Sequence, residues 1–266
     1  MLKSILTFFI TLIFIDQVCG QTDIDKIRDS IIKEADKLYK SEYASWYGTD
    51  IFFQEYKGDQ DIIGGYVSYP IGDDDVCIFY SNSNDPEIIG TIHFKSNKKV
   101  VYDSVRRTMT ATEKDFYNLK TAAQNVIQSD TGLFLYYKGS TLNLVPIIEK
   151  DRKWVYAISG SSKPNTAYLG NDYLMTFTNK NELISKKRIH QSLIPVPYTD
   201  PDKKDEFGSV HNHLPETGDF ITATDICTIR LYQEYGKWKS HIVVSEKYMS
   251  IWTCEGNGLV IVPSPK

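Results

Sequence analysis

Two histidines and a downstream acid are the residues of this chain whose types and spacing point most clearly to chemistry. His211 and His213 flank Asn212, and Asp225 follows twelve residues after His213. On an extended segment, side chains two residues apart point to the same side, and a later carboxylate can return to complete a set of three metal ligands. The sequence therefore predicts a metal site made of His211, His213 and Asp225.

The segments around these residues have the patterns of elements that would position them. Residues 208–213 are predicted to form the strand that delivers both histidines. Thr222 is a favourable N-cap residue and is expected to open a helix that continues to about residue 235. Short apolar runs then predict strands over residues 242–244, 248–252 and 259–262.

The first part of the chain combines a helix with strands. Apolar residues recur at helical spacing behind the capping candidates Thr22 and Asp23, which predicts an amphipathic helix over residues 23–43. The apolar residues that follow come in short runs separated by turn-forming residues. These runs predict strands over residues 51–53, 67–69, 76–80 and 88–94.

A second helix is predicted in the middle of the chain. Thr110 and Glu113 form a capping-box pattern ahead of apolar residues at helical intervals, which gives a helix over residues 111–129. The proline-rich and charged stretch 195–206 indicates a linker. Between them, strands are predicted over residues 133–137, 142–149, 154–159, 173–178 and 182–189.

The N-terminal residues have the composition of a secretory signal sequence. Lys3 precedes an almost wholly apolar run over residues 5–15, and cleavage is expected after Gly20. Because this run is shorter than the roughly 20 residues that cross a bilayer, no transmembrane anchor is predicted. The protein is therefore expected to be exported, to the periplasm or outside the cell, with a lipid anchor on Cys19 as the alternative.

Composition excludes several classes of protein. With 41% hydrophobic residues among 266, the sequence is that of an ordinary folded chain. A net charge of −4 gives no general attraction to nucleic acid. After cleavage only Cys77, Cys227 and Cys254 would remain, and no CxxC spacing occurs. At most one disulfide and no cysteine-based zinc site are therefore expected.

The order of elements around the histidines resembles the JAB/MPN metallopeptidase family, and its bacterial RadC-type branch most. Residues 211–225 read His-Asn-His-Leu-Pro-Glu-Thr-Gly-Asp-Phe-Ile-Thr-Ala-Thr-Asp, which is similar to the family's His-x-His, Pro/Gly loop and Ser-x-x-Asp. The resemblance covers about residues 170–255. It implies a JAB/MPN-like α/β/α domain, placed at residues 151–266. The helix and strands predicted upstream indicate an N-terminal helix-plus-antiparallel-sheet domain of unknown role (21–150), so an α+β chain is expected.

The resemblance also implies a function. The family holds zinc with two histidines and an aspartate, here His211, His213 and Asp225, and keeps water in the fourth position, whose pKa the metal lowers to about 7. Such a protein is a zinc-dependent peptidase or amidase in which metal-bound hydroxide attacks a peptide or isopeptide carbonyl of a peptide or protein substrate. Thr222 matches the family's serine, whose hydroxyl helps stabilise the tetrahedral intermediate.

The general base is the point at which this chain departs from the family. The family's glutamate is expected at the position of Asn171, and an amide cannot take a proton from water. Asp172 and Glu216 are the carboxylates that could serve instead. Two competing hypotheses follow: a non-catalytic JAB/MPN-like binding or scaffold protein, which Asn171 favours, and a different metal hydrolase that carries His-x-His on a barrel strand.

Several of these residues also have simpler roles. The simpler role of Thr222 is that of a helix cap. Asp225 is favoured in a first helical turn even without a metal. Glu216 lies in a turn-forming loop, where solvated side chains are usual. The remaining histidines have no acid or second histidine at ligand spacing and are expected to be packing or surface residues: His93, His190 and His241.

Overall fold

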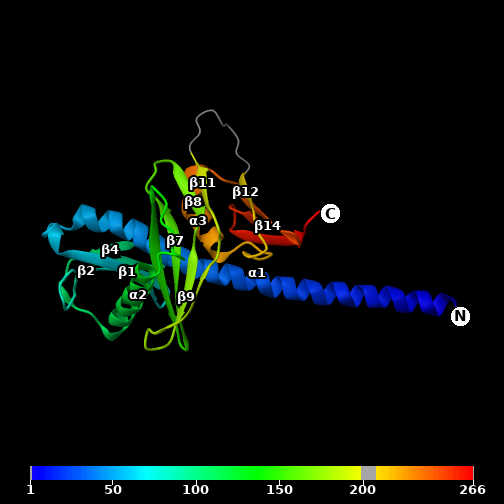
Figure 1. The fold of residues 1–266 in the computed structure, drawn as a ribbon, viewed down its shortest axis with the longest axis horizontal. Coiled ribbons are helices and arrows are strands. Elements are labelled where there is room, and N and C mark those ends of the chain that lie inside the picture. Colours follow the sequence, from blue (N-terminus) through cyan, green and yellow to red (C-terminus); the bar gives the residue numbers. More distant parts are fainter. Residues whose placement is uncertain (1, 199–207, 266) are drawn as a thin grey trace.

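The computed structural model describes residues 2–198 and 208–265, with side chains from Asp23 onward. The predicted signal sequence, with Cys19 and Gly20, lies outside the described side chains. The chain has the expected α+β fold, with small, mainly antiparallel sheets arranged around one long helix (Figure 1). Over the described residues, no helix combines the length and the hydropathy that a membrane span requires.

The long helix α1 (Leu2–Glu55) extends well beyond the predicted range 23–43. Residues 51–53, predicted as a strand, belong to its last turns. The reason is tertiary, because Phe52 is fully buried and stacks on Phe79 with 3.9 Å between ring centroids. A short apolar run cannot by itself distinguish a buried strand from a buried helix end.

The first sheet packs against the C-terminal part of α1 and confirms the strands predicted over 67–69, 76–80 and 88–94. Its strands are antiparallel in the order β1-β2-β3-β4, and β5 pairs with β3. A short 3-10 helix, Gln60–Ile62, precedes it. The strands are β1 (Ile63–Ile71), β2 (Asp74–Ser81), β3 (Glu87–Phe94), β4 (Val100–Asp103) and β5 (Arg107–Thr108).

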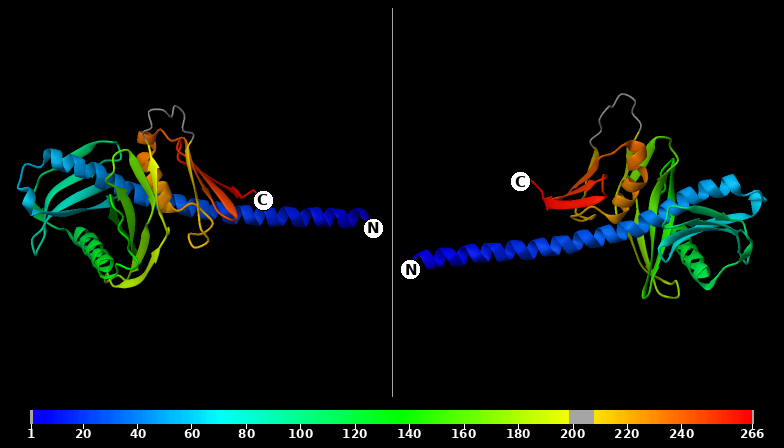
Figure 2. Two further views of the ribbon diagram at one scale, coloured as in Figure 1. Left: turned by 45° about the horizontal axis from the view of Figure 1, so that its top comes forward. Right: turned by 180° about the vertical axis from the view of Figure 1, so that it is seen from behind.

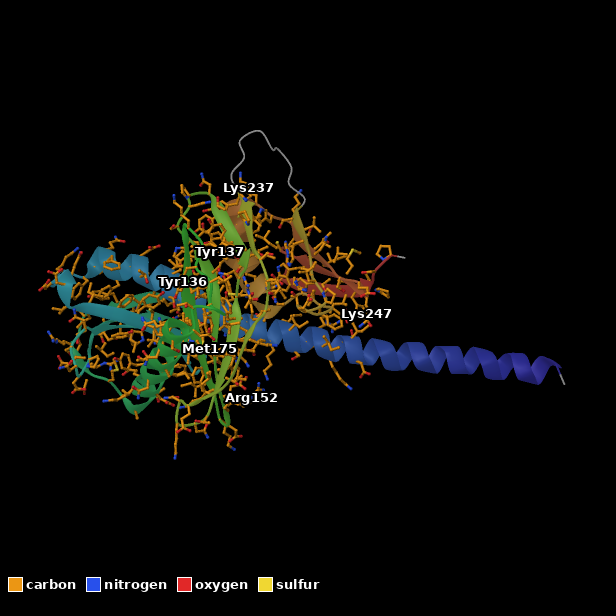
Figure 3. The ribbon with its side chains drawn as sticks, in the orientation of Figure 1. Tyr136, Tyr137, Arg152, Met175, Lys237 and Lys247 are labelled. Carbon is orange, nitrogen blue, oxygen red and sulfur yellow. The ribbon has the colours of Figure 1, made fainter. Side chains whose placement is uncertain are left out.

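Helix α2 (Ala111–Ser129) confirms the predicted helix, and Thr110 and Glu113 form the expected capping box. It packs on the central sheet, in which β6 (Ser140–Glu149), β7 (Arg152–Ser161), β9 (Tyr173–Phe177) and β10 (Leu183–Arg188) take the order β10-β9-β7-β6. Met175 of β9, labelled in Figure 3, is fully buried and packs in one core cluster with residues of α2.

Two predictions around the central sheet need correction. Residues 133–137 are not a strand, because Phe134 is buried in the core beneath α2 and Leu135 N–H donates to the Tyr173 hydroxyl instead of a strand partner. The domain boundary predicted at residue 150 falls in the turn of the β6–β7 hairpin. The central sheet is therefore continuous across that boundary.

The C-terminal part contains two further sheets. In the larger one, β12 (Gly208–Asn212), β13 (Ser240–Val244), β14 (Tyr248–Thr253) and β15 (Gly258–Pro263) lie in that order and confirm the predicted strands. In the smaller one, β11 (Leu193–Pro197) pairs with β8 (Thr166–Gly170), so the predicted linker 195–206 begins inside a strand. Its residues 199–206 lie outside the described part of the chain.

Helix α3 (Ala223–Gly236) joins the two halves of the molecule. It begins and ends close to the predicted positions, and it lies between the central sheet and the C-terminal sheet while α1 passes alongside (Figure 2). Its buried residues pack with α1 and the C-terminal sheet in one core cluster. Cys77, Cys227 and Cys254 are buried and carry free thiols.

Candidate metal centre

The two predicted histidines lie at the end of strand β12, which pairs with β13 in parallel. His211 and His213 are buried, whereas Asn212 between them is exposed, as the alternation of side chains along an extended segment requires. His213 lies just beyond the strand and keeps the extended pairing through its N–H, which donates to the Val244 carbonyl at 2.8 Å. Both imidazoles consequently face the start of α3.

The predicted carboxylate ligand is placed by the cap of that helix. Thr222 is the N-cap residue, and its hydroxyl accepts from the Asp225 N–H at 3.1 Å and donates to Asp225 Oδ2 at 2.7 Å. The Thr222 N–H donates to the same oxygen at 3.0 Å. The capping box thus orients Asp225 toward the two histidines.

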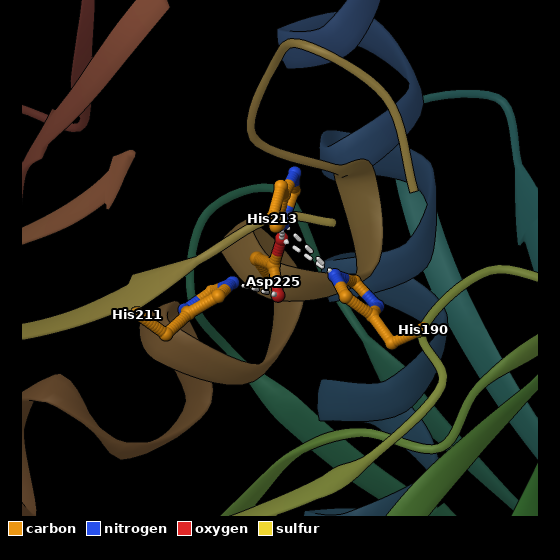
Figure 4. A group of neighbouring side chains, drawn as sticks. All are labelled: His190, His211, His213 and Asp225. Atoms are coloured by element: carbon orange, nitrogen blue, oxygen red, sulfur yellow. Dashed lines mark hydrogen bonds and ion pairs between the residues drawn. The ribbon is translucent and has the colours of Figure 1, made fainter. Parts of the chain in front are cut away.

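A fourth side chain, His190, completes the group (Figure 4). One donor atom from each of His190, His211, His213 and Asp225 lies within 4.8 Å of all the others, and all four residues are buried. The expectation that His190 is only a packing or surface residue is therefore wrong. Such a buried group of three imidazoles and one carboxylate could hold a metal ion.

The separations between the donor atoms fit a small ion. A tetrahedral zinc ion with bonds of about 2.0–2.1 Å places its donor atoms about 3.3–3.4 Å apart. His213 Nε2 lies 3.0 Å from His190 Nε2 and 3.4 Å from Asp225 Oδ2. Asp225 Oδ2 lies 3.5 Å from His190 Nε2, and Asp225 Oδ1 lies 3.7 Å from His211 Nε2.

Unsatisfied atoms in this group support the same conclusion. His211 Nε2 and Asp225 Oδ1 are buried and have no hydrogen-bond partner within the described part of the chain. Buried polar atoms are rarely left unpaired in native proteins, and each such case calls for a partner such as an ion. With neutral histidines, the buried carboxylates of Asp225 and nearby Asp172 also leave two negative charges that a divalent cation would balance.

His190 is held in place by a carboxylate. Asp172 lies between β8 and β9, and its Oδ1 accepts from the backbone N–H of His190 at 3.1 Å and lies 2.7 Å from His190 Nδ1. The Thr224 hydroxyl donates to Asp172 Oδ2. The Asp172 bond to Nδ1 leaves Nε2 of His190 to face the other three side chains, the usual arrangement for a metal-binding histidine.

A side chain also contacts the second ring nitrogen of His211, the one that does not face the group. Its Nδ1 lies 2.9 Å from Nε2 of His241, and Nδ1 of His241 lies 2.7 Å from the Ser209 hydroxyl. When Nε2 of His211 binds a metal, Nδ1 carries the proton and donates to His241, which in turn donates to Ser209. His241, expected to be a packing or surface residue, therefore orients the candidate ligand His211.

The electrostatics of the group follow from burial and close charges. Burial alone lowers the pKa of His190, but Asp225 and Asp172 raise that pKa to about 11. Burial raises the pKa of Asp225, but His190 and His211 hold it well below its usual value. Burial lowers the pKa of His211, and burial with His211 nearby lowers the pKa of His241 to about 3. His190 thus lies between two carboxylates, which favour its protonated form.

Of the three residues predicted to take part in catalysis, Asp172 and Thr222 lie beside the four grouped side chains, and Glu216 does not belong to the group. Asp172 lies next to the group, with both carboxylate oxygens occupied by His190 and Thr224. Thr222 is the N-cap residue of α3, and its hydroxyl donates to the Asp225 carboxylate. Glu216 is exposed in the loop between β12 and α3 and is not among the four grouped residues.

Asn171, at the position expected for the family's glutamate, is engaged elsewhere. It is fully buried with φ of 48°, and its amide donates to the Leu135 carbonyl at 3.0 Å and to the Ser159 hydroxyl at 3.1 Å. Its carbonyl oxygen accepts from the Tyr173 hydroxyl at 2.7 Å. These bonds give Asn171 a structural role in the central sheet.

Sequence reasoning missed His190 because its partners are distant in sequence. It precedes His211 by 21 residues and follows a strand of another sheet, so no local spacing marks it as a ligand. The one available signal was chemical: it is one of only five histidines, four of which meet here.

The sequence matches no protein-family model, and no curated protein shows significant similarity to it.

Proposed function

We propose that this chain is a zinc-dependent hydrolase of the JAB/MPN type that acts on a peptide or isopeptide carbonyl. The observation that carries the proposal is the meeting of His211, His213 and Asp225 at the junction of β12 and α3. Strand β12, helix α3 and the parallel strand β13 follow one another in the order that the resemblance implies. Bound zinc would polarise a carbonyl and lower the pKa of a water molecule.

The donor set favours zinc over the hard cations. Imidazole nitrogen suits zinc and the later transition metals, whereas magnesium and calcium prefer oxygen donors throughout. In this proposal His211, His213 and Asp225 hold the ion, and Thr222 orients Asp225. The substrate is a peptide or protein, and the predicted export after Gly20 belongs to the same proposal.

Metal analysis of the purified mature chain is the first test. We expect one zinc ion per chain, and its loss in a His211→Ala, His213→Ala double variant that keeps the circular dichroism of the parent. A parent protein that binds no zinc, either as isolated or after reconstitution, would exclude the metal centre. Hydrolysis of peptide and isopeptide-linked substrates, absent from the double variant, then tests the activity.

A non-catalytic JAB/MPN-like binding or scaffold protein is the second candidate. Two observations favour it: Asn171 is bonded within the central sheet, and both oxygens of Asp172 are occupied, so neither is free to act as a general base. This candidate predicts stoichiometric zinc with no hydrolysis of any substrate in the panel. Hydrolysis that disappears with the zinc would rule it out.

A further inference from the structure

His190 reaches the metal-binding group from a separate part of the fold. His211, His213 and Asp225 all belong to the β12–α3 unit, whereas His190 lies in the connection between β10 and β11. Three residues of one local unit are enough for a catalytic zinc site, which keeps its fourth position open. A fourth donor from another segment would occupy the position that a catalytic zinc site leaves open for water.

The imidazole of His190 lies at the distance from the other donor atoms that a metal ligand would have. Its Nε2 lies 3.0 Å from His213 Nε2 and 3.5 Å from Asp225 Oδ2, as close as the other donors lie to each other. Its side chain is only 6% exposed, beside 0% for His213 and 1% for Asp225. The group thus has four donors at ligand separations, all removed from solvent.

Hydrogen bonds to the backbone N–H and to Nδ1 fix the orientation of the His190 side chain. Asp172 binds both its backbone N–H and its Nδ1, and Thr224 holds the other oxygen of Asp172. Thr224 belongs to the same helical turn as Asp225, so the residue that supports His190 is tied to the helix that carries another ligand. The imidazole can hardly turn away without breaking these bonds.

We propose that His190 is the fourth protein ligand and closes the coordination sphere of the metal, so that water and anions bind the metal only when His190 leaves it. The proposal rests on the metal-binding part of the proposed function and not on hydrolysis. It departs from the resemblance, which implies an open fourth position. A hydrolase with this centre is latent, and its activation requires the displacement of His190.

Cobalt substitution of the full mature chain tests closure directly, because the visible spectrum of Co²⁺ reports its coordination number. We expect the parent protein to show a four-coordinate spectrum that does not change when azide is added. In His190→Ala, we expect metal affinity to fall by at least the roughly 10-fold to 100-fold that loss of an outer partner costs, and azide to change the spectrum. The matched control is His93→Ala, which removes a half-buried histidine of β3 and should behave as the parent.

A second variant keeps the test decisive if His190→Ala does not fold. His190→Gln retains a polar side chain of similar reach, and it should likewise become sensitive to azide. Free imidazole added to either variant should restore the parent spectrum, because it replaces the missing donor without repairing any packing. An azide-sensitive parent protein, or variants whose spectra match the parent, would overturn the proposal.

The possible failures can be told apart. If the parent binds cobalt in a closed site and the variants open it, but nothing is hydrolysed, closure stands and only the hydrolase is excluded. If the parent hydrolyses substrate and its cobalt spectrum responds to azide, the hydrolase stands and closure is wrong. A parent that binds no cobalt or zinc contradicts both.

Discussion

Nδ1 of His211 lies 2.9 Å from Nε2 of His241, a buried histidine of strand β13 whose pKa burial lowers to about 3. His241 is therefore neutral at any physiological pH, and its Nε2 can accept a hydrogen bond from the Nδ1–H of His211. The parallel pairing of β12 with β13 places Ser209 opposite His241 and makes this contact possible.

We predict that His241→Ala weakens metal binding, because His211 loses the partner that fixes its tautomer and ring orientation. The expected loss is roughly 10-fold to 100-fold in zinc affinity. Competition with a zinc chelator measures it, and His241→Gln, which offers an amide acceptor, should recover part of the loss. Equal affinities in His241→Ala and the parent would show that the contact does not orient a ligand.

Asp172→Asn should lower metal affinity by a similar factor, roughly 10-fold to 100-fold. The carboxylate accepts hydrogen bonds from the backbone and imidazole of His190 and from Thr224, and an amide places an N–H₂ group against at least one of these donors. The same chelator competition applies. Glu216→Gln, at an exposed carboxylate outside the group, is the matched control and should leave the affinity unchanged.

Glu113 should make the stability of the protein depend on acid pH. Burial alone raises the pKa of Glu113, but hydrogen bonds from Arg107, Thr110 and Tyr69 lower it to about 2 from the usual 4.5. A carboxyl with a lowered folded-state pKa stabilises the protein above the unfolded pKa, and this contribution is lost as the pH falls from about 4.5 toward 2. Its size is on the order of 3 kcal/mol.

Urea unfolding of Glu113→Gln and the parent at pH 7 and pH 3 checks this prediction. The variant should be the less stable protein at pH 7, and the difference should shrink at pH 3. At pH 3 the unfolded parent is stabilised by a proton on Glu113 that the folded parent binds only weakly. A difference that is the same at both pH values would mean that the carboxylate charge contributes nothing. Zinc affinity at pH 7 should not change, since Glu113 lies at the start of α2, away from the metal-binding group.

Gly90→Ala should destabilise the packing of the first sheet against α1. A Cβ atom at Gly90 would lie 2.7 Å from Cε2 of Phe52, whose ring already stacks on Phe79. Because this rigid ring is fully buried, we expect a loss of about 1–3 kcal/mol in the free energy of unfolding. Gly132→Ala, where the nearest atom would be 3.5 Å away, should cost much less in the same denaturant titration.

Local pattern was sufficient for much of the fold. The capping box at Thr110 and the N-cap residue Thr222 predicted the starts of α2 and α3, because these signals depend on side chains within one helical turn. The strands of the C-terminal sheet were predicted from short apolar runs between turn residues. The strands predicted over residues 51–53 and 133–137 were wrong, because the burial of Phe52 and Phe134 decides the conformation of these segments and local periodicity does not.

The sequence by itself determined three members of the candidate metal-binding group. His211 and His213 share one side of an extended segment, and Asp225 belongs to the first turn of a capped helix, so strand alternation and helix capping alone bring them to one place. Only the tertiary structure decided the fourth member and the outer partners. His190, Asp172 and His241 come from segments that meet only when the central and C-terminal sheets pack around α3, and no spacing along the chain encodes that meeting.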